Sequence, residues 1–500
     1  MSRRSRSEFV ALALTVVACA LPFLLTVGAD PDLWWHVQSG QRILADRGIP
    51  AVDDWSFTAA GQAWTNHEWL SDVIMARVFD TAGSMGLLIL RGSLFVLLVS
   101  GLVVGVAHRV RAPLLVLLVV LLTTPILAVF INMRAHTFTY TLVVWVVVVL
   151  DRVKEERWRW LAALPPMMLL WVNLHGGFVL GLGLVGLTLF LILIGLDGVP
   201  QRPIGRPLQL LIATGLATLA ASLVNPYGFG LFTYLVSELG ANHSIISEWQ
   251  PIAGAQLAYF WGYLLIPVAL WLIARRWQQV GLLFMLLLTS WSTWNQARFF
   301  VLTGLFGALV AAEALGVIVP RLRDRFDWPL VDRLLEPAPA AVGIASLAVV
   351  VAVPFSMGLV RGDARLDVDT SLYPIAATEW LATRNAGPNL ANPLAYGGYI
   401  IWHLGPETKV AVDGRNLTIY DDEWVDSYLR SLRDGRALEV LDEDTVDLWL
   451  LPADSKQIAA LEATGRWAIA YRDPIAVVVL PGPLARVVTG EQPPPPREFP

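Results

Sequence analysis

The chain has 500 residues, of which 56% are hydrophobic and only 15% are charged, and its mean hydropathy is +0.58. This composition excludes an ordinary soluble domain and predicts a multi-pass membrane protein. A formal net charge of -5, with no basic patch interleaved with aromatic residues, excludes nucleic acid as a partner, and a single cysteine, Cys19, excludes a disulfide framework.

The first apolar run covers residues 9 to 28. It is as long as the ~20 residues of a membrane-spanning helix, whereas the apolar part of a signal peptide has about 7 to 15. We therefore expect a retained span, and the alternative is a secretory or twin-arginine signal cleaved after Ala29. Further apolar runs cover residues 86–107, 112–131, 136–150, 159–173, 176–196, 207–224, 256–274, 278–293, 298–319 and 339–360. The sequence thus predicts a polytopic α-helical membrane protein with about 11 spans, some of which tilt, break or re-enter.

Lys and Arg gather in alternate loops, which places the N-terminus in the cytoplasm and the C-terminal residues outside. Lysine occurs only at positions 154, 409 and 456, a bias typical of a bacterial genome rich in G and C, so we expect a bacterial plasma membrane. Within the spans, Arg91 and Glu313 are the exceptions to an uncharged sequence, which disfavours an ion-coupled carrier. The polar and aromatic clusters all fall in outer loops, so we expect the function at the outer face.

Residues 29–85 form a long first outer loop, and loops of this length are commonly functional. Asp32 is suited to cap a helix over residues 33–47 that ends at Gly48. The stretch "DDWSFTAAGQAWT" predicts a hairpin, and Thr65 or Asn66 is suited to cap a second surface helix. We expect both helices to lie at the membrane interface, in a membrane domain of residues 1–360.

Helical and strand-like segments alternate over residues 361–488, which predicts a small extracytoplasmic α/β domain with a mostly parallel sheet. Asp413 and Arg415 follow a predicted strand, where α/β domains bind ligands, and are candidates for contacting an acceptor or lining a cleft. A simple turn explains them equally well. Residues 489–500 are rich in proline and predict a disordered tail.

The stretches "DPDLWWHVQSGQRILADRGIPAVDDWSFTAAGQAWTNHEWL", "NLHGGF" and "YGGYIIWHLGPETKVAVDGR", in this order of spans and outer loops, resemble the GT-C superfamily of integral-membrane glycosyltransferases. The similarity covers nearly the whole chain and fits a bacterial branch whose members mostly lack an assigned substrate. It implies a sugar donor linked to a polyprenyl phosphate, which enters from the bilayer. It also implies an acceptor from outside and an acidic residue in the first outer loop that acts as a base or metal ligand.

That acidic role falls by position to Asp30 or Asp32, although the sequence has Asp-Pro-Asp where the protein mannosyltransferases have Asp-Glu. Asp30 is favoured because capping does not explain it, and a divalent metal ion shared by both is a further option. His67 and Glu68 are additional catalytic candidates, the alternative being a solvated helix start. His36, next to Trp35, is expected to be a satisfied interfacial histidine.

Arg134 and Arg298 abut span ends on the side where basic residues are rare, so either is a candidate for binding the donor phosphate. The alternative is that they reach lipid headgroups. Asn173 and His175 are candidates for binding donor phosphate or sugar, or for capping helix ends. Glu248, in an aromatic outer loop, is a further candidate in the cleft.

We therefore expect a glycosyltransferase that moves a sugar from a lipid carrier to an extracytoplasmic glycan, lipid or protein. Two alternatives are a transporter or flippase of lipid-linked saccharides and a non-catalytic assembly protein of the cell envelope. The sugar, the acceptor, the cofactor and any dependence on metal are not specified by the sequence.

Overall fold

The computed structural model describes residues 3–21, 27–129, 132–196, 203–239, 247–275, 280–326, 329, 336, 344–345, 347–348, 351, 366–384, 387–415, 418–484, 488–489 and 497–500. The chain forms two compact units. The helical unit comprises residues 1–25, 88–228 and 248–364, and the mixed unit comprises residues 26–87, 229–247 and 365–500. The first outer loop thus groups with the C-terminal residues, whereas the sequence-based division kept it with the spans. Separate folding of the two parts stays a prediction.

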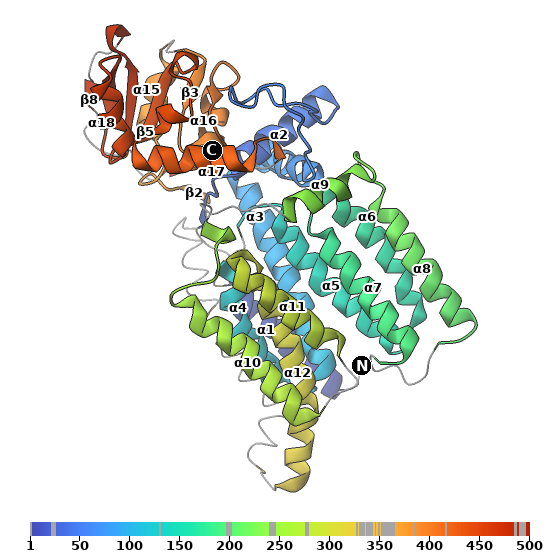
Figure 1. Ribbon diagram of the computed structural model, residues 1–500. Coiled ribbons are helices and arrows are strands. Elements are labelled where there is room, and N and C mark those ends of the chain that lie inside the picture. The colour runs from blue at the N-terminus through green and yellow to red at the C-terminus, as the bar shows by residue number, and fades with distance from the viewer. Residues whose placement is uncertain are drawn as a thin grey trace. The chain divides into compact units, whose positions relative to one another are not determined.

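The helical unit is a bundle of apolar helices (Figure 1). Its helices are α1 (Arg3–Ala20), α4 (Pro113–Val129), α5 (His136–Lys154), α6 (Leu164–Leu174), α7 (Phe178–Ile194), α8 (Arg206–Ser222), α10 (Gln256–Ala274), α11 (Gly281–Asn295), α12 (Phe300–Arg325) and the later part of α3 (Trp69–Arg109). Apart from residues 339–360, which lie largely outside the described residues, each predicted apolar run overlaps one of these helices. The multi-pass architecture is therefore confirmed, and the number of crossings stays a prediction.

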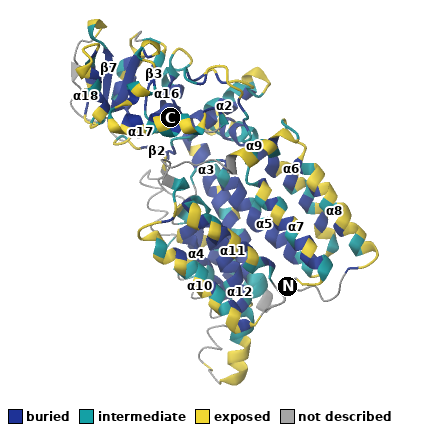
Figure 2. Cartoon of the chain, in the orientation of Figure 1, coloured by how far each residue is buried: buried dark blue, intermediate teal, exposed yellow. Residues whose placement is uncertain are grey.

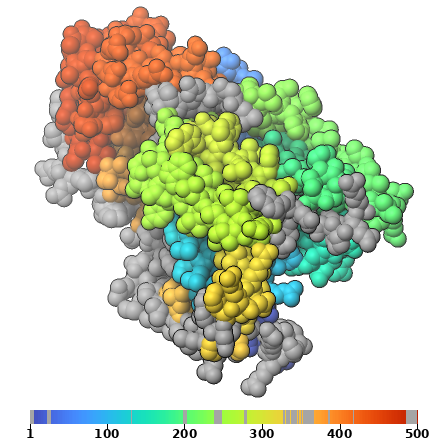
Figure 3. All heavy atoms as spheres, turned by 60° about the horizontal axis from the view of Figure 1, so that its bottom comes forward, coloured from blue at the N-terminus to red at the C-terminus, as the bar shows by residue number. Residues whose placement is uncertain are grey.

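By length and composition, the described residues include four helical stretches able to cross a membrane, namely 69–109, 136–154, 256–274 and 297–325. They differ in their surroundings within the unit: the apolar stretch of α5 is 78% buried and that of α10 only 22% (Figure 2). Large apolar side chains of α10 are exposed, among them Tyr259, Leu265 and Ile266, and its yellow-green atoms lie on the face seen in Figure 3. Such an apolar surface is suited to lipid.

Glu313, one of the two charged residues predicted inside the spans, belongs to an ion-pair group with Arg109 and Asp151. Arg109, at the end of α3, donates through Nη1 and Nη2 to the two carboxylate oxygens of Asp151 at 2.8 Å. Its Nε lies 3.4 Å from Glu313 Oε2 in α12. All three side chains are largely buried, so the group links α3, α5 and α12 by charge-assisted hydrogen bonds. Glu313 is thus an anchor of the bundle.

The mixed unit is built on a six-stranded sheet with the strand order β4-β3-β5-β7-β6-β8. The strands are β3 (Asn389–Ala391), β4 (Lys409–Val410), β5 (Leu448–Pro452), β6 (Trp467–Arg472), β7 (Ala476–Pro481) and β8 (Val488–Thr489). β4, β3 and β5 run parallel, β7 is antiparallel to both β5 and β6, and β8 is parallel to β6. The sheet is therefore mixed, because a hairpin joins β6 to β7, and the mostly parallel sheet expected from the sequence is only partly present.

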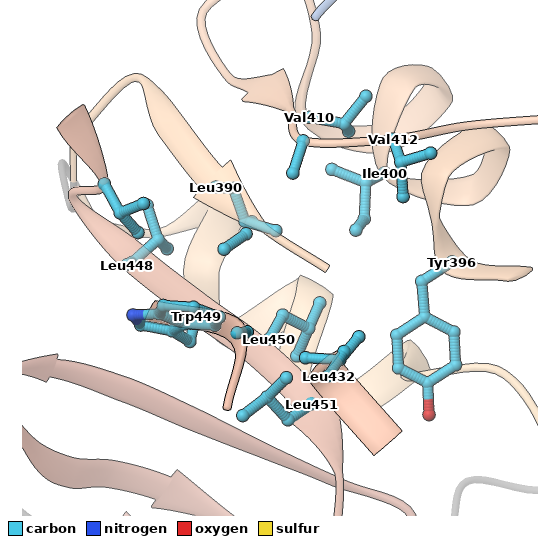
Figure 4. Packing of buried hydrophobic residues seen from close by; sticks show 14 of the residues in the cluster. Leu390, Tyr396, Ile400, Val410, Val412, Leu432, Leu448, Trp449, Leu450 and Leu451 are labelled. Atoms are coloured by element: carbon cyan, nitrogen blue, oxygen red, sulfur yellow. The ribbon is translucent and has the colours of Figure 1, made fainter. Parts of the chain in front are cut away.

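Four helices pack with this sheet: α15 (Ile375–Ala382), α16 (Leu394–Leu404), α17 (Asp422–Asp434) and α18 (Lys456–Ala463). Figure 4 shows the core that they enclose, in which Trp449 and Leu451 of β5 lie near Leu390 and Leu432. Every residue of β5 except Pro452 is buried, as expected for a strand covered on both faces. The C-terminal α/β region predicted from the sequence is thus present as a fold.

The first outer loop completes this core. Trp35, Trp55 and Trp64 belong to the same hydrophobic cluster as the sheet residues. The predicted hairpin is confirmed: Val52 pairs with Ala63, and residues 55–57 exchange backbone hydrogen bonds with Val410 of β4. The hairpin thus covers a sheet edge that would otherwise expose unpaired backbone groups.

The two surface helices of the loop each differ from the expectation at one end: the first at its start, the second at its finish. The first is α2 (Leu33–Asp46), and the Asp32 side chain makes no capping hydrogen bond to it. The second continues as α3 into the next apolar run, with a break in helical geometry at Gly83 (φ 60°, ψ -153°). Glycine tolerates a positive φ, which explains how one continuous segment changes direction there.

The proline-rich end of the chain is not wholly disordered. Arg497–Glu498 form β9, which pairs with β2 (Leu366–Val368), and β2 in turn pairs with β1 (Val27–Gly28). Phe499 is buried, and its ring lies 5.2 Å from that of Trp34. An apolar residue beyond the prolines gives the tail something to bury, which corrects the expectation for its last residues. Residues 490–496 lie outside the described part.

Candidate functional site

The most unusual polar cluster of the mixed unit lies where α2 crosses the start of α3. His36 and Ser39 are one helical turn apart, so they share a face of α2. Asp72 faces them from the first turn of α3 and accepts hydrogen bonds from Ser39 Oγ at 2.7 Å and Asn66 Nδ2 at 2.8 Å. Its other oxygen lies 2.6 Å from His36 Nδ1. None of these four side chains is exposed by more than a few per cent.

A glycine permits this close crossing. A Cβ at Gly40 would lie 2.1 Å from the backbone oxygen of Asp72, so any larger residue would push α2 away from α3. Because the two backbones touch, short side chains such as Ser39 reach across. The sequence places an apparently unremarkable "QSGQR" at this point, and the requirement for glycine appears only in the structure.

Glu68 lies between two histidines at the opening of the cluster. Its Oε2 is 3.9 Å from His36 Nε2, and its Oε1 is 3.6 Å from His67 Nε2. The Glu68 and His67 side chains are 16% and 15% exposed, whereas those of His36 and Asp72 are 3% and 0% exposed. Glu68 is therefore the more accessible carboxylate of this cluster, whereas His36 and Asp72 are buried.

The electrostatics of this cluster favour a charged imidazole. Burial acts to lower the pKa of His36, but the neighbouring carboxylates of Asp72, Glu68 and Asp32 together outweigh it, and the pKa is raised above its ordinary value. The hydrogen bond from Nδ1 to Asp72 adds to this effect. A buried histidine whose pKa is raised by surrounding carboxylates is unlike the satisfied interfacial histidine expected from the sequence.

Asp30 has a structural duty in the turn before α2. Its Oδ1 accepts a hydrogen bond from the backbone N–H of Asp32 at 3.0 Å, and its backbone oxygen accepts one from Leu33. The residue is 6% exposed. Asp30 therefore shapes the turn that leads into α2. The lack of a structural duty was the reason to favour it over Asp32, and the structure removes that reason.

Asp32 instead lies against the Asp413-Gly-Arg415 turn. A Cβ at Gly414 would lie 1.8 Å from Asp32 Oδ1 and 2.8 Å from Trp35 Nε1. Only glycine leaves room for this carboxylate, so the turn and the start of α2 are fitted to one another. The Asp32 side chain is half-buried and is therefore more accessible than that of Asp30.

The carboxylates of the loop do not form a metal site by geometry. Within the described part of the chain, no group of three or more His, Cys, Asp or Glu side chains is placed to hold a metal ion. Asp30 directs one oxygen to a backbone N–H, and Pro31 separates it from Asp32. Among the described residues, Asp30 and Asp32 are thus not part of a group of three or more such side chains.

In the helical unit, the two candidate phosphate-binding arginines meet the same short segment. Arg134 Nη1 lies 2.8 Å from Glu248 Oε1, and the guanidinium of Arg298 lies 3.4 Å from the ring centroid of Trp249. Arg298 Nε also donates to Gln296 Oε1 at 3.1 Å. Residues 247–249 thus bring Arg134, Arg298 and Glu248 together, a grouping that the sequence did not predict.

Asn173 and His175 act at helix ends in the same unit. Asn173 Nδ2 donates to the backbone oxygens of Leu169 and Val224, both at 2.9 Å. His175 Nδ1 accepts the backbone N–H of Gly177 at 2.9 Å and lies 2.9 Å from Thr139 Oγ1. These contacts correspond to the capping alternative, and they leave the Nε2 side of His175 as its donor when the ring is neutral.

Asp413 and Arg415 are inside the protein. Arg415 Nε and Nη2 donate to the two oxygens of Asp413, and Tyr420 donates to Asp413 as well. The Arg415 guanidinium lies against the rings of both Trp55 and Trp64, at 4.6 and 4.8 Å from their centroids. Neither charged side chain has exposed surface, so both serve the core of the unit, and contact with an acceptor is not proposed for them.

Sequence reasoning named Glu68 and His67 but missed Ser39, Asn66 and Asp72, and it assigned His36 a passive role. One signal was available: His36 and Ser39 stand at helical spacing on the side of α2 that also carries Leu33 and Gly40, where polar residues are unusual. The partner, Asp72, lies 36 positions away from His36 in the first turn of another helix. No local pattern connects the two.

No protein-family model matches the sequence, and no curated protein matches it. Solved structures do match. The oligosaccharyltransferase AglB of Archaeoglobus fulgidus, solved with an inhibitory peptide and a dolichol-phosphate, matches with a TM-score of 0.59 at 11% identity, over 91% of this chain and 70% of that one.

The arabinofuranosyltransferase AftD from Mycobacteria matches with a TM-score of 0.54 at 13% identity, over 96% of this chain and 40% of that one. ArnT from Cupriavidus metallidurans in the apo state matches with a TM-score of 0.53 at 16% identity, over 96% of this chain and 98% of that one. At these identities the likeness is one of fold. The resemblance to the GT-C superfamily of membrane glycosyltransferases is thus confirmed for the fold of this chain.

Proposed function

We propose that the protein is a glycosyltransferase of the membrane that moves a sugar from a polyprenyl-phosphate-linked donor to an extracytoplasmic acceptor. The observation that carries the proposal is the fold, which is shared with glycosyltransferases over nine tenths of the chain or more. A fold alone does not specify chemistry, so the site has to supply the rest. The acidic cluster in the first outer loop supports it.

Glu68 is the base in this proposal. Inverting transfer requires a group that takes the proton of the acceptor hydroxyl as the sugar leaves the phosphate. Glu68 is partly exposed and faces two imidazoles, whereas Asp30 is largely buried and directs an oxygen to the backbone. Asp32 is the second candidate, since it is half-buried and closely fitted to Gly414.

Arg134 and Arg298 are proposed to bind the donor phosphate. Guanidinium groups suit phosphate because they offer planar, paired donors. Dolichol-phosphate is bound in the structure of the Archaeoglobus enzyme, and the same chemistry, a phosphate on a lipid, would suit the two arginines here. The distribution of Lys and Arg supports a bacterial plasma membrane with the N-terminus in the cytoplasm and the mixed unit outside.

The test uses the purified full-length protein in lipid nanodiscs with a panel of radiolabelled polyprenyl-phosphate hexoses and pentoses. We expect release of polyprenyl phosphate, by transfer or slow hydrolysis, from at least one donor. Glu68→Gln should lower the rate 10²- to 10⁴-fold, the usual contribution of a general base. The matched control, Glu407→Gln, alters an exposed carboxylate of the same unit and should leave the rate unchanged.

Other outcomes would favour the two alternatives. A flippase would move a labelled lipid-linked saccharide across the membrane of proteoliposomes, and equally fast in Glu68→Gln as in the wild type. Equal rates would indicate this alternative, because the Glu68 carboxylate would then have no chemical task. Absence of turnover with every donor, combined with binding of a cell-envelope polymer to the intact protein, would indicate an assembly protein.

A further inference from the structure

The Asp72–His36 pair is more than the packing of two helices requires. Burying a carboxylate is costly unless it is fully hydrogen-bonded, and apolar residues of similar size usually serve a helix crossing at least as well. Asp72 has no exposed side-chain surface, yet three donors surround it. These contacts allow a carboxylate to stay buried at this position and to act on the imidazole beside it.

The hydrogen bonds of Asn66 and Ser39 determine which of their atoms donate to Asp72. Asn66 Oδ1 accepts the backbone N–H of Glu68 at 3.2 Å, so its Nδ2 is the end that points to Asp72 and, at 3.0 Å, to Ser39 Oγ. Since Ser39 accepts from Asn66, its own proton goes to Asp72. One oxygen of Asp72 thus accepts from both Ser39 and Asn66, and its other oxygen faces His36 Nδ1, to which we assign the proton of that hydrogen bond.

This assignment leaves the other nitrogen of His36 facing Glu68. His36 Nε2 is 3.9 Å from Glu68 Oε2. Among the described residues, the charged groups that raise the pKa of this ring are Asp72 and Glu68 at the start of α3 and Asp32 at the start of α2. All three are carboxylates. The ring of Trp35 stacks on that of His36 with 3.7 Å between the centroids, and Tyr399 of α16 packs its ring edge against the neighbouring Trp34. A second proton on His36 is thus surrounded by negative charge.

We propose that Asp72 holds His36 as a buried imidazolium whose Nε2–H faces Glu68, and that this fixed cation keeps Glu68 ionised and ready to accept the acceptor's proton. The inference rests on the proposed function for its consequence, though not for the charge state of His36. His36 and Asp72 are positioning residues, because they act on the substrate through Glu68. His67, on the other side of Glu68 and 15% exposed, is more strongly screened by water.

The reaction step balances without any change in His36. The acceptor O–H loses its proton to a Glu68 oxygen as the acceptor oxygen bonds to the anomeric carbon of the sugar. The bond from that carbon to the phosphate oxygen breaks, and its electron pair stays on the polyprenyl phosphate. Glu68, which is partly exposed, then returns the proton to water. The imidazolium keeps both of its protons throughout.

The first arm of the test measures the charge of His36 directly, without substrate. The full-length protein is labelled with ¹⁵N-histidine in nanodiscs, and the imidazole nitrogens are followed against pH. We expect one histidine to stay doubly protonated above pH 7, its signals to vanish in His36→Gln, and its titration to move to lower pH in Asp72→Asn. A neutral His36 at pH 7 would overturn the proposal, whether or not the protein has transferase activity.

The second arm measures the acid limb of kcat/KM. Removing a positive charge 3.9 Å from Glu68 should move this limb to higher pH by about one unit in His36→Gln, so that activity below the limb falls about tenfold. His67→Gln, the matched control on the exposed side, should move it much less. An unchanged limb in an active His36→Gln enzyme would contradict the inference while leaving the proposed function intact. Inactivity of the wild type would contradict the proposed function alone.

A milder variant covers the case in which His36→Gln fails to fold. Ser39→Ala keeps both charged residues and removes only one hydrogen bond from Asp72. With one donor fewer, the carboxylate attracts the proton of His36 more strongly, so the imidazole should titrate at higher pH than in the wild type. A shift to lower pH, or none, would show that Asp72 does not set the charge of His36.

Discussion

Arg415 Nη1 lies 2.7 Å from Asp53 Oδ1, although the two residues are far apart in the chain, and neither side chain has exposed surface. Asp413 and the rings of Trp55 and Trp64 complete the surroundings of the guanidinium. Through this group the hairpin of the first outer loop and the turn after β4 share one buried charge network. The same unit carries the proposed base, so the network helps to fix the loop on which Glu68 stands.

Replacement of Arg415 should therefore destabilise the mixed unit strongly. Arg415→Met leaves Asp53 and Asp413 buried without their cation, and breaking a buried pair in this way typically costs about 3–5 kcal/mol. The measurement is thermal unfolding of the full-length protein, followed by tryptophan fluorescence, because Trp55 and Trp64 flank the site. Arg430→Met is the matched control: Arg430 pairs with Asp426 at the surface of α17, where the expected loss is below about 1 kcal/mol. Equal losses in both variants would contradict a special role for the network.

Gly414→Ala should act on the site with less effect on the fold. The added Cβ would meet Asp32 Oδ1 at 1.8 Å, a contact that forces the carboxylate or the turn to move. We expect a reduced rate of transfer with a small change in unfolding temperature, because the half-buried carboxylate of Asp32 can move more easily than a side chain of the core. Gly230→Ala, where nothing lies within 4 Å of the added atom, should change neither quantity. Normal activity of Gly414→Ala would show that the position of Asp32 is not critical.

The sequence was sufficient for the parts of the fold that repeat a simple pattern. Long apolar runs gave the helices of the bundle, because a span must be apolar over its whole length. The hairpin around "AAGQ" was also predictable from turn residues between alternating ones. The likeness to GT-C enzymes was visible in the order of spans and loops, and the solved structures confirm it for the fold.

The site was less predictable because its contacts join distant segments. Asp30 was favoured as catalytic on the ground that it capped nothing, and the structure gives it the bond to the N–H of Asp32. His36 and Asp72 meet only because Gly40 lets two helices touch, and a glycine in a helix does not by itself predict a crossing. The grouping of Arg134 and Glu248 likewise depends on a loop far along the chain. Local patterns identified candidate residues, and tertiary packing decided their partners.

The Arg134–Glu248 ion pair predicts opposite effects of its two members on donor binding. If Arg134 binds the donor phosphate, Glu248 competes with that phosphate at a separation of 2.8 Å. Arg134→Gln should raise the KM for the donor about tenfold or more, as expected for a lost hydrogen bond to a charged group. Glu248→Gln should lower it, because the guanidinium no longer has to leave a carboxylate. A KM raised by both variants would indicate that the pair is structural.

Arg298→Lys tests the neighbouring arginine by shape at constant charge. A guanidinium stacks on the Trp249 ring as a plane, whereas an ammonium group offers a compact, strongly hydrated charge. We expect the lysine variant to bind the donor more weakly although its charge is unchanged, with steady-state kinetics against donor concentration as the measurement. Arg275→Lys, at the C-terminal cap of α10, serves as the control for a general loss of arginine. Donor kinetics equal to those of the wild type would remove Arg298 from the phosphate site.

Stability should depend on pH through His36 in a defined direction. The pKa of His36 is raised in the folded protein above its ordinary value of 6.5 because the carboxylates of Asp72, Glu68 and Asp32 outweigh the effect of burial. A group of this kind stabilises the fold fully below the unfolded pKa, and the stabilisation is lost as the pH rises through the folded pKa. The wild type should therefore lose stability as the pH increases above about 6.5, and His36→Gln should lose less over the same range. Unfolding temperatures measured between pH 5.5 and 9 decide the matter, and parallel curves for the two proteins would show that His36 does not carry a stabilising charge.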